Sequence, residues 1–334
     1  MTSNFEKRIH FIIGLLLMAW MVAWQGCAQF SALPEESRLT VYGIDSNAEP
    51  FVARWAPVFL TYGYADPYNR IGRPTASAEG ATQKVWVDPG QPTVYVMQRT
   101  FATAKATYTN LIYRVHFPEV PFSLVPFNLT AGDNVGLMVV VTLDAQGQPV
   151  LVTSVHTCGC YKAFVPTDHL PDEALPDGWR LDQPREVYGE QLPPRLTYSS
   201  SDHPKLLIHL RPALHRVMHM EVVPAETLRG ERYAPQTMAV APMEDLLRLP
   251  GDKGPTSFFY DTGWRQGHVK GSIKPFEMIF MSLISLDLFV GSDKIYADPV
   301  VSGNPFYTSL KPWRRDDSDM WDFPRFLAYW GWGL

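Results

Sequence analysis

The chain has 334 residues, with 34 acidic and 29 basic side chains and a formal net charge of -5 at pH 7. This charge, together with the lack of a basic run or a phosphate-cradling glycine loop in the sequence, argues against a nucleic-acid partner. Hydrophobic residues make up 46% and aromatic residues 13% of the chain, which excludes an intrinsically disordered protein. The 29 prolines disfavour long helices and favour strands joined by irregular loops.

The first residues of the chain have the order of a secretory signal. The basic pair Lys7-Arg8 precedes an apolar run over 11–23, and Gly26-Cys27-Ala28 follows. The apolar run is shorter than the about 20 residues that a membrane-spanning helix needs. We therefore expect residues 1–27 to direct export and residues 28–334 to form the exported globular region.

The end of this segment carries a candidate lipid-attachment site. Trp24-Gln25-Gly26-Cys27 resembles a bacterial lipoprotein lipobox, in which the cysteine becomes the acylated first residue of the mature chain. The first two positions depart from the usual leucine and small residue, whereas Gly26 and Cys27 fit. The resemblance implies a lipid anchor on Cys27, and Ala28 resembles the residue that sends lipoproteins to the outer membrane. The alternative is cleavage after Ala28, which would give a soluble periplasmic protein.

The exported region is long enough to bury a substantial core without disulfide bonds. Short apolar runs between proline- and glycine-containing breaks predict a mainly β fold, with a sandwich-like or barrel-like body and long proline-rich loops. The clearest unit is a β-hairpin with strands over 134–143 and 149–156, joined by a turn that contains Gly147. A proline- and acid-rich connection over 165–195 is where a boundary between two packed subdomains would fall.

The C-terminal half is expected to hold further strands and one helix. Apolar residues predict strands over 206–210 and 215–223. The segment over 275–290 is apolar nearly all round, with a proline at its start and a glycine after its end, and it predicts one buried helix near the C-terminus. The aromatic residues that end the chain are expected to pack on their own domain.

The candidate site is the segment His156-Thr157-Cys158-Gly159-Cys160, at the end of the predicted hairpin. Its cysteines are the only ones outside the N-terminal segment. Three alternatives remain open for them: a metal site with His156, a disulfide or redox pair, and two buried structural thiols. Alternate residues of an extended backbone point the same way, and thiolates with an imidazole suit copper or zinc. A disulfide between residues two apart needs a bend, which Gly159 permits.

A second group of candidate ligands follows in the sequence. If 215–223 is a strand, His215 and His219 share one face, and we expect them to supply ligands that the cysteine segment lacks. The alternative is that they are partly exposed strand residues. An acidic cluster over 316–322 offers oxygen ligands for calcium, but the arginines beside it favour an ion-paired turn.

No signature of nucleophilic or paired-carboxylate catalysis stands out, so the sequence favours binding over catalysis. The leading hypothesis is an exported, lipid-anchored protein on the periplasmic side of the outer membrane, acting in metal binding, delivery or electron transfer. Its expected ligands for copper or zinc are His156, Cys158, Cys160, His215 and His219. The alternatives are a structural or interaction protein with a protein partner, and a thiol-disulfide redox protein that uses Cys158 and Cys160.

Overall fold

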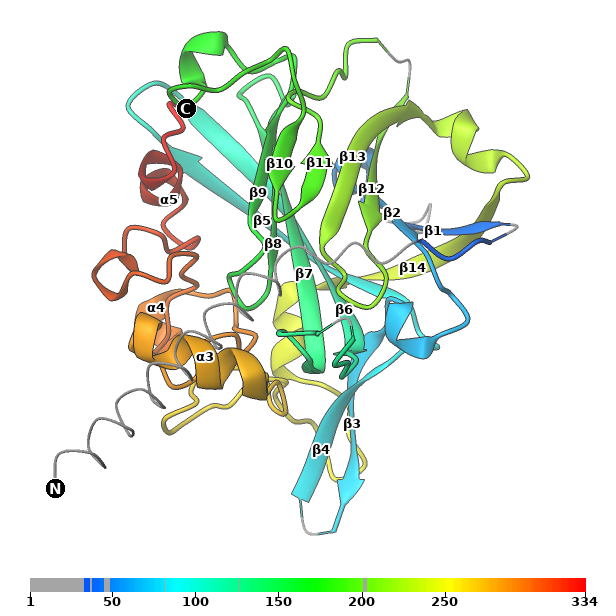
Figure 1. Cartoon of the computed structure of the whole chain (residues 1–334), viewed down its shortest axis with the longest axis vertical. Coiled ribbons are helices and arrows are strands. Elements are labelled where there is room, and N and C mark those ends of the chain that lie inside the picture. Colours follow the sequence, from blue (N-terminus) through cyan, green and yellow to red (C-terminus); the bar gives the residue numbers. More distant parts are fainter. Residues whose placement is uncertain (1–32, 37, 45–48, 81, 126, 201–202) are drawn as a thin grey trace, which may run out of the picture.

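The computed structural model describes residues 33–36, 38–44, 49–80, 82–125, 127–200 and 203–334. The predicted signal segment and Cys27 lie outside these residues. The described chain forms a ten-stranded mixed sheet that is nearly closed into a barrel, with a few short helices near the C-terminus (Figure 1). The prediction of a mainly β, barrel-like fold is therefore confirmed.

The sheet combines parallel and antiparallel neighbours. Its strands are β1 (Leu39–Ile44), β2 (Val58–Thr61), β5 (Thr93–Ala102), β6 (Thr107–Val120), β7 (Gly132–Leu143), β8 (Pro149–His156), β9 (Ala163–Pro166), β12 (Pro204–Leu210), β13 (Val217–Pro224) and β14 (Tyr233–Pro242). Hydrogen-bonded neighbours follow the order β13-β12-β2-β1-β14-β5-β6-β7-β8-β9. The pairs β1 with β14, β2 with β12 and β14 with β5 are parallel, and the other neighbours are antiparallel.

Two hairpins and several short helices complete the described chain. The hairpins are β3 (Arg73–Glu79) with β4 (Thr82–Asp88), and β10 (Arg185–Val187) with β11 (Glu190–Leu192). The α-helices are α2 (Pro50–Trp55), α3 (Pro275–Ser285), α4 (Pro299–Ser302) and α5 (Phe323–Tyr329). The 3-10 helices are η1 (Pro67–Asn69), η2 (Asp172–Ala174), η3 (Ala225–Arg229), η4 (Met243–Leu247) and η5 (Pro312–Arg314). In Figure 1 the β3–β4 hairpin projects from the body.

The predicted β7–β8 hairpin forms, and both of its faces are buried. The turn is closed by Asp144, whose side chain accepts hydrogen bonds from the backbone N–H groups of Gln146 and Gln148. Alternate residues of β7 enter different clusters: Val139 packs in the cluster inside the sheet, whereas Met138 packs against the C-terminal segment. A strand covered on both sides carries a continuous apolar run, as β7 does.

The C-terminal segment covers the outer face of the sheet around β7 and β8. The aromatic side chains of Phe323, Phe326 and Trp332 are buried in the same cluster as Met138 and Val140 of β7. The expectation that the aromatic tail packs on its own domain is confirmed. This layer matters for the candidate site because it continues from residues 290–310, which lie against the end of β8.

The helix predicted over 275–290 forms, but it is shorter and only one side of it is buried. It ends at Ser285 because Leu286 adopts a left-handed conformation, with φ of 50°. Leu283 is 84% exposed and Ile279 is 67% exposed, whereas Glu277 is buried. The apolar composition of the segment indicated burial on all sides, but only the face toward the body is covered. No helix among the described residues is long and apolar enough to cross a membrane.

The connection over 165–195 contains the β10–β11 hairpin, which lies beside β13 (Figure 1). Glu190 of β11 joins it to the turn between β12 and β13. Its carboxylate accepts hydrogen bonds from Arg211 at 2.6 and 2.7 Å and from Arg216 at 2.7 Å. Burial raises the pKa of Glu190, but the two guanidinium groups outweigh this and hold it below its ordinary value. The predicted subdomain boundary in this segment stays a prediction.

Candidate functional site

The cysteine segment forms a tight turn directly after β8. The N–H of Gly159 donates to the carbonyl oxygen of His156 at 2.7 Å, and the N–H of His156 donates to that of Cys160 at 3.0 Å. Gly159 has a φ of +90°, so the chain bends where the sequence permits it. The bend brings the Cα atoms of Cys158 and Cys160 to 5.5 Å, and the two residues form a disulfide.

His156, Cys158 and Cys160 form a group that could hold a metal ion. Their donor atoms all lie within 4.8 Å of one another. His156 and Cys158 are buried, and Cys160 is half-buried. Because the sulfur atoms are joined in the structure, they become thiolate ligands only after reduction. The predicted combination of one imidazole and two sulfurs is thus brought together by a single turn.

The imidazole of His156 is held neutral. Burial, reinforced by the positive charge of Lys274, lowers its pKa to about 3. The ring packs edge-on against Tyr161, with ring centres 4.8 Å apart. Its Nε2 atom is buried and has no hydrogen-bond partner. A buried neutral imidazole with an unpartnered nitrogen has the protonation state that a metal ligand needs.

A buried polar network lies directly behind the turn, centred on Asp293. Its carboxylate accepts hydrogen bonds from the hydroxyls of Thr157 and Ser272 and lies 3.1 Å from Nζ of Lys274. The backbone N–H of Gly136 on β7 also donates to it at 3.1 Å. Burial raises the pKa of Asp293, but Lys274 and these hydrogen bonds outweigh it, so the carboxyl stays ionised. The network fixes the cysteine turn against β7 and the segment over 272–294.

A second buried lysine touches the cysteine turn itself. Nζ of Lys294 donates to the carbonyl oxygen of Cys158 at 2.5 Å and lies 4.3 Å from the ring centre of Tyr307. Burial lowers the pKa of Lys294 to about 8, so the amine is mostly protonated at pH 7. A positive charge beside a cysteine favours its thiolate form. The turn therefore lies in an environment that stabilises negative charge on sulfur.

A cavity of about 360 Å³ opens beside the cysteines. Besides the cysteine turn, its walls include Met281 and Ile284 of α3, Tyr188 and Tyr307. Glu277 also lines it, and burial raises the pKa of this carboxyl. The cavity gives the half-buried side of the turn mostly apolar surroundings. The thioether-containing side chain of Met281 lines the same cavity as the two cysteines.

The structure places His215 and His219, the predicted ligands of the second group, in different environments. His215 lies in the turn before β13, where its Nε2 donates to the carbonyl oxygen of Tyr68 at 2.8 Å and its ring stacks on Phe117. His219 lies on β13 and is exposed, with its ring beside His209. Among the described residues, the one group of close donor atoms contains neither of them. That they complete the site stays a prediction.

The expected strand over 215–223 begins two residues later than predicted. Ala213 and His215 both have positive φ values, of 64° and 56°, which form a tight turn closed by the N–H of Arg211 donating to the carbonyl oxygen of Arg216. His215 is therefore buried against Phe117, and it does not share a strand face with His219. Ala213 gives no signal of left-handed backbone, and a histidine is only modestly enriched there, so the turn did not stand out in the sequence.

Sequence reasoning missed the residues that surround the turn. Lys274, Asp293 and Lys294 come from a segment more than a hundred positions after the cysteines, and no local motif signals them.

In the acidic cluster over 316–322, Asp317 pairs with Arg314 at 2.8 Å and with Arg325 at 2.6 Å. The ion-paired turn that the arginines favoured is thus what forms.

Comparisons with models of protein families, with curated proteins and with solved structures give no match for this chain.

Proposed function

We propose that the protein is an exported, lipid-anchored copper-binding protein that holds one cuprous ion between His156, Cys158 and Cys160. The observation that carries the proposal is the clustering of their three donor atoms within 4.8 Å at a rigid turn. Its export and its anchor on Cys27 rest on the sequence of the first 28 residues. Binding and delivery of copper are the roles that we assign to the site.

The donor set favours Cu(I) over zinc. Soft thiolates select cuprous copper, which three donors can satisfy, whereas structural zinc sites are almost always four-coordinate. Among the described residues no fourth His, Cys, Asp or Glu donor joins the group. A water ligand would have to lie in a mostly apolar cavity, where few groups could hydrogen-bond to it. Met281, which lines that cavity, offers a thioether suited to receiving or releasing Cu(I).

The buried charges around the turn also fit this occupant. Two thiolates, one neutral imidazole and Cu(I) carry a net charge of -1. Two buried ammonium groups lie next to the turn: Lys274, which pairs with Asp293, and Lys294, which donates to the carbonyl oxygen of Cys158. Compensation of a buried charge is needed because an isolated ion in a protein interior is strongly unfavourable. The ammonium group of Lys294 would offset the negative charge of a cuprous dithiolate.

Copper binding is coupled to the redox state of the cysteines. Reduction of the disulfide takes up two electrons and two protons and gives two thiols, and Cu(I) then displaces both thiol protons. A reducing partner is therefore required before the metal binds. The disulfide form is the metal-free form. In this form the imidazole of His156 already lies beside the two sulfur atoms.

The test is a competition titration between the protein and a cuprous chelator of known affinity, under anaerobic conditions. The reduced protein is expected to bind one Cu(I) per chain, and the oxidised protein none. Cys158→Ser and Cys160→Ser should each lose at least a hundredfold in affinity, whereas His219→Ala, a matched control at an exposed histidine, should bind as the unmodified protein does. A reduced, folded protein that takes up no copper would remove the proposal.

A second candidate function is thiol-disulfide exchange, which the Cys158–Cys160 bond favours. Cys160 is the more exposed of the two and faces the cavity. A thiolate of a partner dithiol would attack Sγ of Cys160 and release Cys158 as the thiolate, which Lys294 stabilises. The partner's second thiol would then displace Cys160, leaving an oxidised partner and a reduced pair.

The two candidates are separated by a glutathione-equilibration assay. Thiol-disulfide exchange predicts that the free thiolate of Cys160 in Cys158→Ser attacks the disulfide form of a dithiol peptide and traps a mixed disulfide, releasing the second thiol of the peptide. It also predicts that the unmodified protein oxidises the reduced peptide catalytically in the presence of oxidised glutathione. Stoichiometric copper binding without peptide oxidation supports copper binding alone. Peptide oxidation without copper binding supports the second candidate and contradicts the first.

A further inference from the structure

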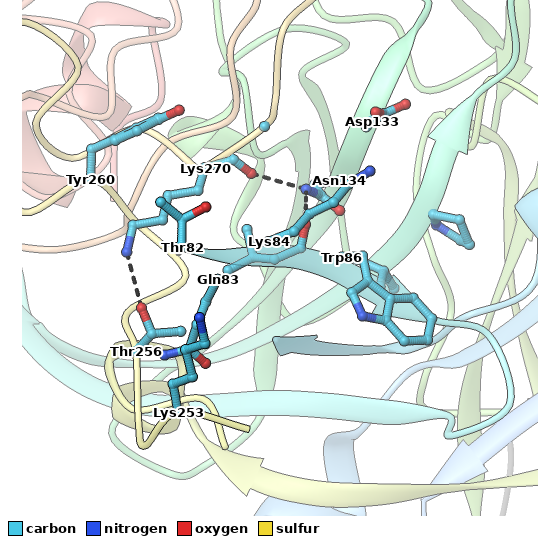
Figure 2. A pocket seen from close by; sticks show the side chains of 14 residues that line it. Thr82, Gln83, Lys84, Trp86, Asp133, Asn134, Lys253, Thr256, Tyr260 and Lys270 are labelled. Carbon is cyan, nitrogen blue, oxygen red and sulfur yellow. Dashed lines mark hydrogen bonds between the residues drawn. The ribbon is translucent and has the colours of Figure 1, made fainter. Parts of the chain in front are cut away.

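A second cavity, of about 770 Å³, is larger than the one beside the cysteines and shares no lining residue with it. One wall is β4, a strand of the projecting hairpin, and another is formed by the loops around residues 253–260 and 270–271 (Figure 2). The start of β7 closes it with Asp133 and Asn134. No cysteine or histidine lines this cavity.

Hydrogen bonds between the walls give this cavity a fixed shape. The side-chain amide of Asn134 donates to the carbonyl oxygens of Val85 and Lys270, at 3.2 and 2.9 Å, and so joins β7 to β4 and to the loop (Figure 2). The amide of Gln83 donates to the carbonyl oxygen of Gly254 at 3.2 Å. Walls that are already held in place lower the entropy lost when a ligand binds.

The cavity carries an excess of positive charge in a chain whose net charge is negative. Its ionisable lining residues are Lys84, Lys253 and Lys270 against Asp133 alone, with Tyr260 beside them. Lys253 donates to the carbonyl oxygen of Gly80, and Lys270 donates to the hydroxyl of Thr256 at 3.3 Å. Lys84 is exposed, and no ion pair or hydrogen bond joins its ammonium group to a described residue. These ammonium groups suit an anionic ligand.

An exposed tryptophan and several neutral polar groups line the same space. Trp86 follows Lys84 on the outward face of β4 and is 39% exposed, with no aromatic or cationic partner among the described residues. Figure 2 shows its indole on the side of the pocket opposite Lys253 and Lys270. The amide side chain of Gln83 and the hydroxyl of Thr256 also belong to the lining. An exposed indole beside hydroxyl and amide groups suits a ligand with both an apolar face and hydroxyls.

We propose that this cavity binds an anionic saccharide, with Trp86 stacking on a sugar ring and the lysines holding its acidic group. A sugar ring has C–H groups on its face and hydroxyls at its edge, and a uronic acid or a sulfated or phosphorylated sugar adds the negative charge. A cavity of this volume accommodates more than one sugar ring. The site is independent of the copper site and of its redox state.

Calorimetric titration of the whole exported protein tests the proposal with four probes: a galacturonic acid oligosaccharide, the neutral galactose oligosaccharide of equal length, a sulfated disaccharide and inorganic phosphate. At least one anionic saccharide should bind at least tenfold more tightly than the neutral one, and this difference should shrink as salt is added. The anionic saccharide that binds most tightly shows whether the site prefers a carboxylate or a sulfate group. If inorganic phosphate binds as tightly as the best saccharide, the cavity does not recognise a sugar ring and the proposal is overturned.

Variants decide whether the cavity is the site. Trp86→Ala and Lys84→Glu should each weaken binding at least tenfold, and both side chains are exposed enough to be changed without loss of folding. The matched controls are Trp313→Ala, at an indole that is 76% exposed elsewhere, and Lys311→Glu, which makes the same charge change outside the cavity. Equal affinity in the cavity variants and the controls, or no binding of any anionic saccharide, would overturn the proposal.

Discussion

The carbonyl oxygen of Tyr307 occupies the space that a side chain on Gly159 would need: a Cβ built on this glycine lies 2.1 Å from that oxygen. The cysteine turn is thus in direct backbone contact with the C-terminal segment. Gly159 is required both by its positive φ and by this contact. The geometry of Cys158 and Cys160 therefore depends on a segment that is nearly 150 positions away in the sequence.

Gly159→Ala is expected to destabilise the fold by more than about 3 kcal/mol, because the left-handed conformation costs about 1–2 kcal/mol and the contact with Tyr307 adds to it. Gly147→Ala is the matched control, since Gly147 also has a positive φ but has open space around it. Gly147→Ala should lose only the about 1–2 kcal/mol of unfolding free energy that the left-handed conformation costs. Urea unfolding of both variants measures the difference, and equal losses would contradict the role of the contact.

Asp293→Ala is expected to cost about 3–5 kcal/mol of unfolding free energy, because it leaves Lys274 buried without its partner. It should also loosen the cysteine turn, since Thr157 loses its acceptor. Asp182→Ala removes an equivalent charge from an exposed pair with Arg180 and should have no measurable effect. Chemical denaturation tests both, and a stable Asp293→Ala protein would show that the network does not support the turn.

Stability is expected to fall as the pH drops below about 6.5, because buried histidines must take up protons when the chain unfolds. Burial lowers the pKa of His268 to about 4, so this residue is neutral when folded and protonated when unfolded between pH 6.5 and 4. Its contribution is fully present above 6.5 and falls by up to about 1.4 kcal/mol per pH unit below it. His268→Gln should flatten the pH dependence measured by urea unfolding between pH 7.5 and 5; an unchanged slope would contradict the assignment.

Acylation of Cys27 is expected if the lipobox resemblance holds. Metabolic labelling with a fatty acid in a bacterial host should mark the protein, and Cys27→Ser should lose both the label and membrane association. Cys160→Ser serves as the control and should keep the label. A secreted protein that starts after Ala28 and carries no lipid would instead support ordinary cleavage.

The parts of the structure that follow from local patterns were accessible from the sequence. The β7–β8 hairpin has strand-like apolar runs on either side of turn residues such as Asp144 and Gly147, and it forms as predicted. The clustering of His156, Cys158 and Cys160 needs only one tight turn, which Gly159 makes available. These features depend on residues within a few positions of each other.

The parts that depend on distant contacts were not accessible. Thr157 and Asp293 are 136 positions apart, and only the folded chain shows that they are hydrogen-bonded. His215 lies in a turn where it and Ala213 are left-handed, and these two residue types signal such a turn too weakly for it to be predicted. The helix α3 is apolar on both sides, but what covers it is decided by tertiary packing, which leaves Leu283 exposed.

The central claim is that one histidine and two cysteines hold copper. X-ray absorption spectroscopy of the reduced, copper-loaded protein identifies the atoms bound to the metal most directly. The proposed site predicts Cu(I) coordinated by two sulfurs and one imidazole nitrogen, and His156→Ala should remove the nitrogen contribution while leaving both sulfurs. A first coordination shell of nitrogen and oxygen alone, or a spectrum unchanged by His156→Ala, would contradict it.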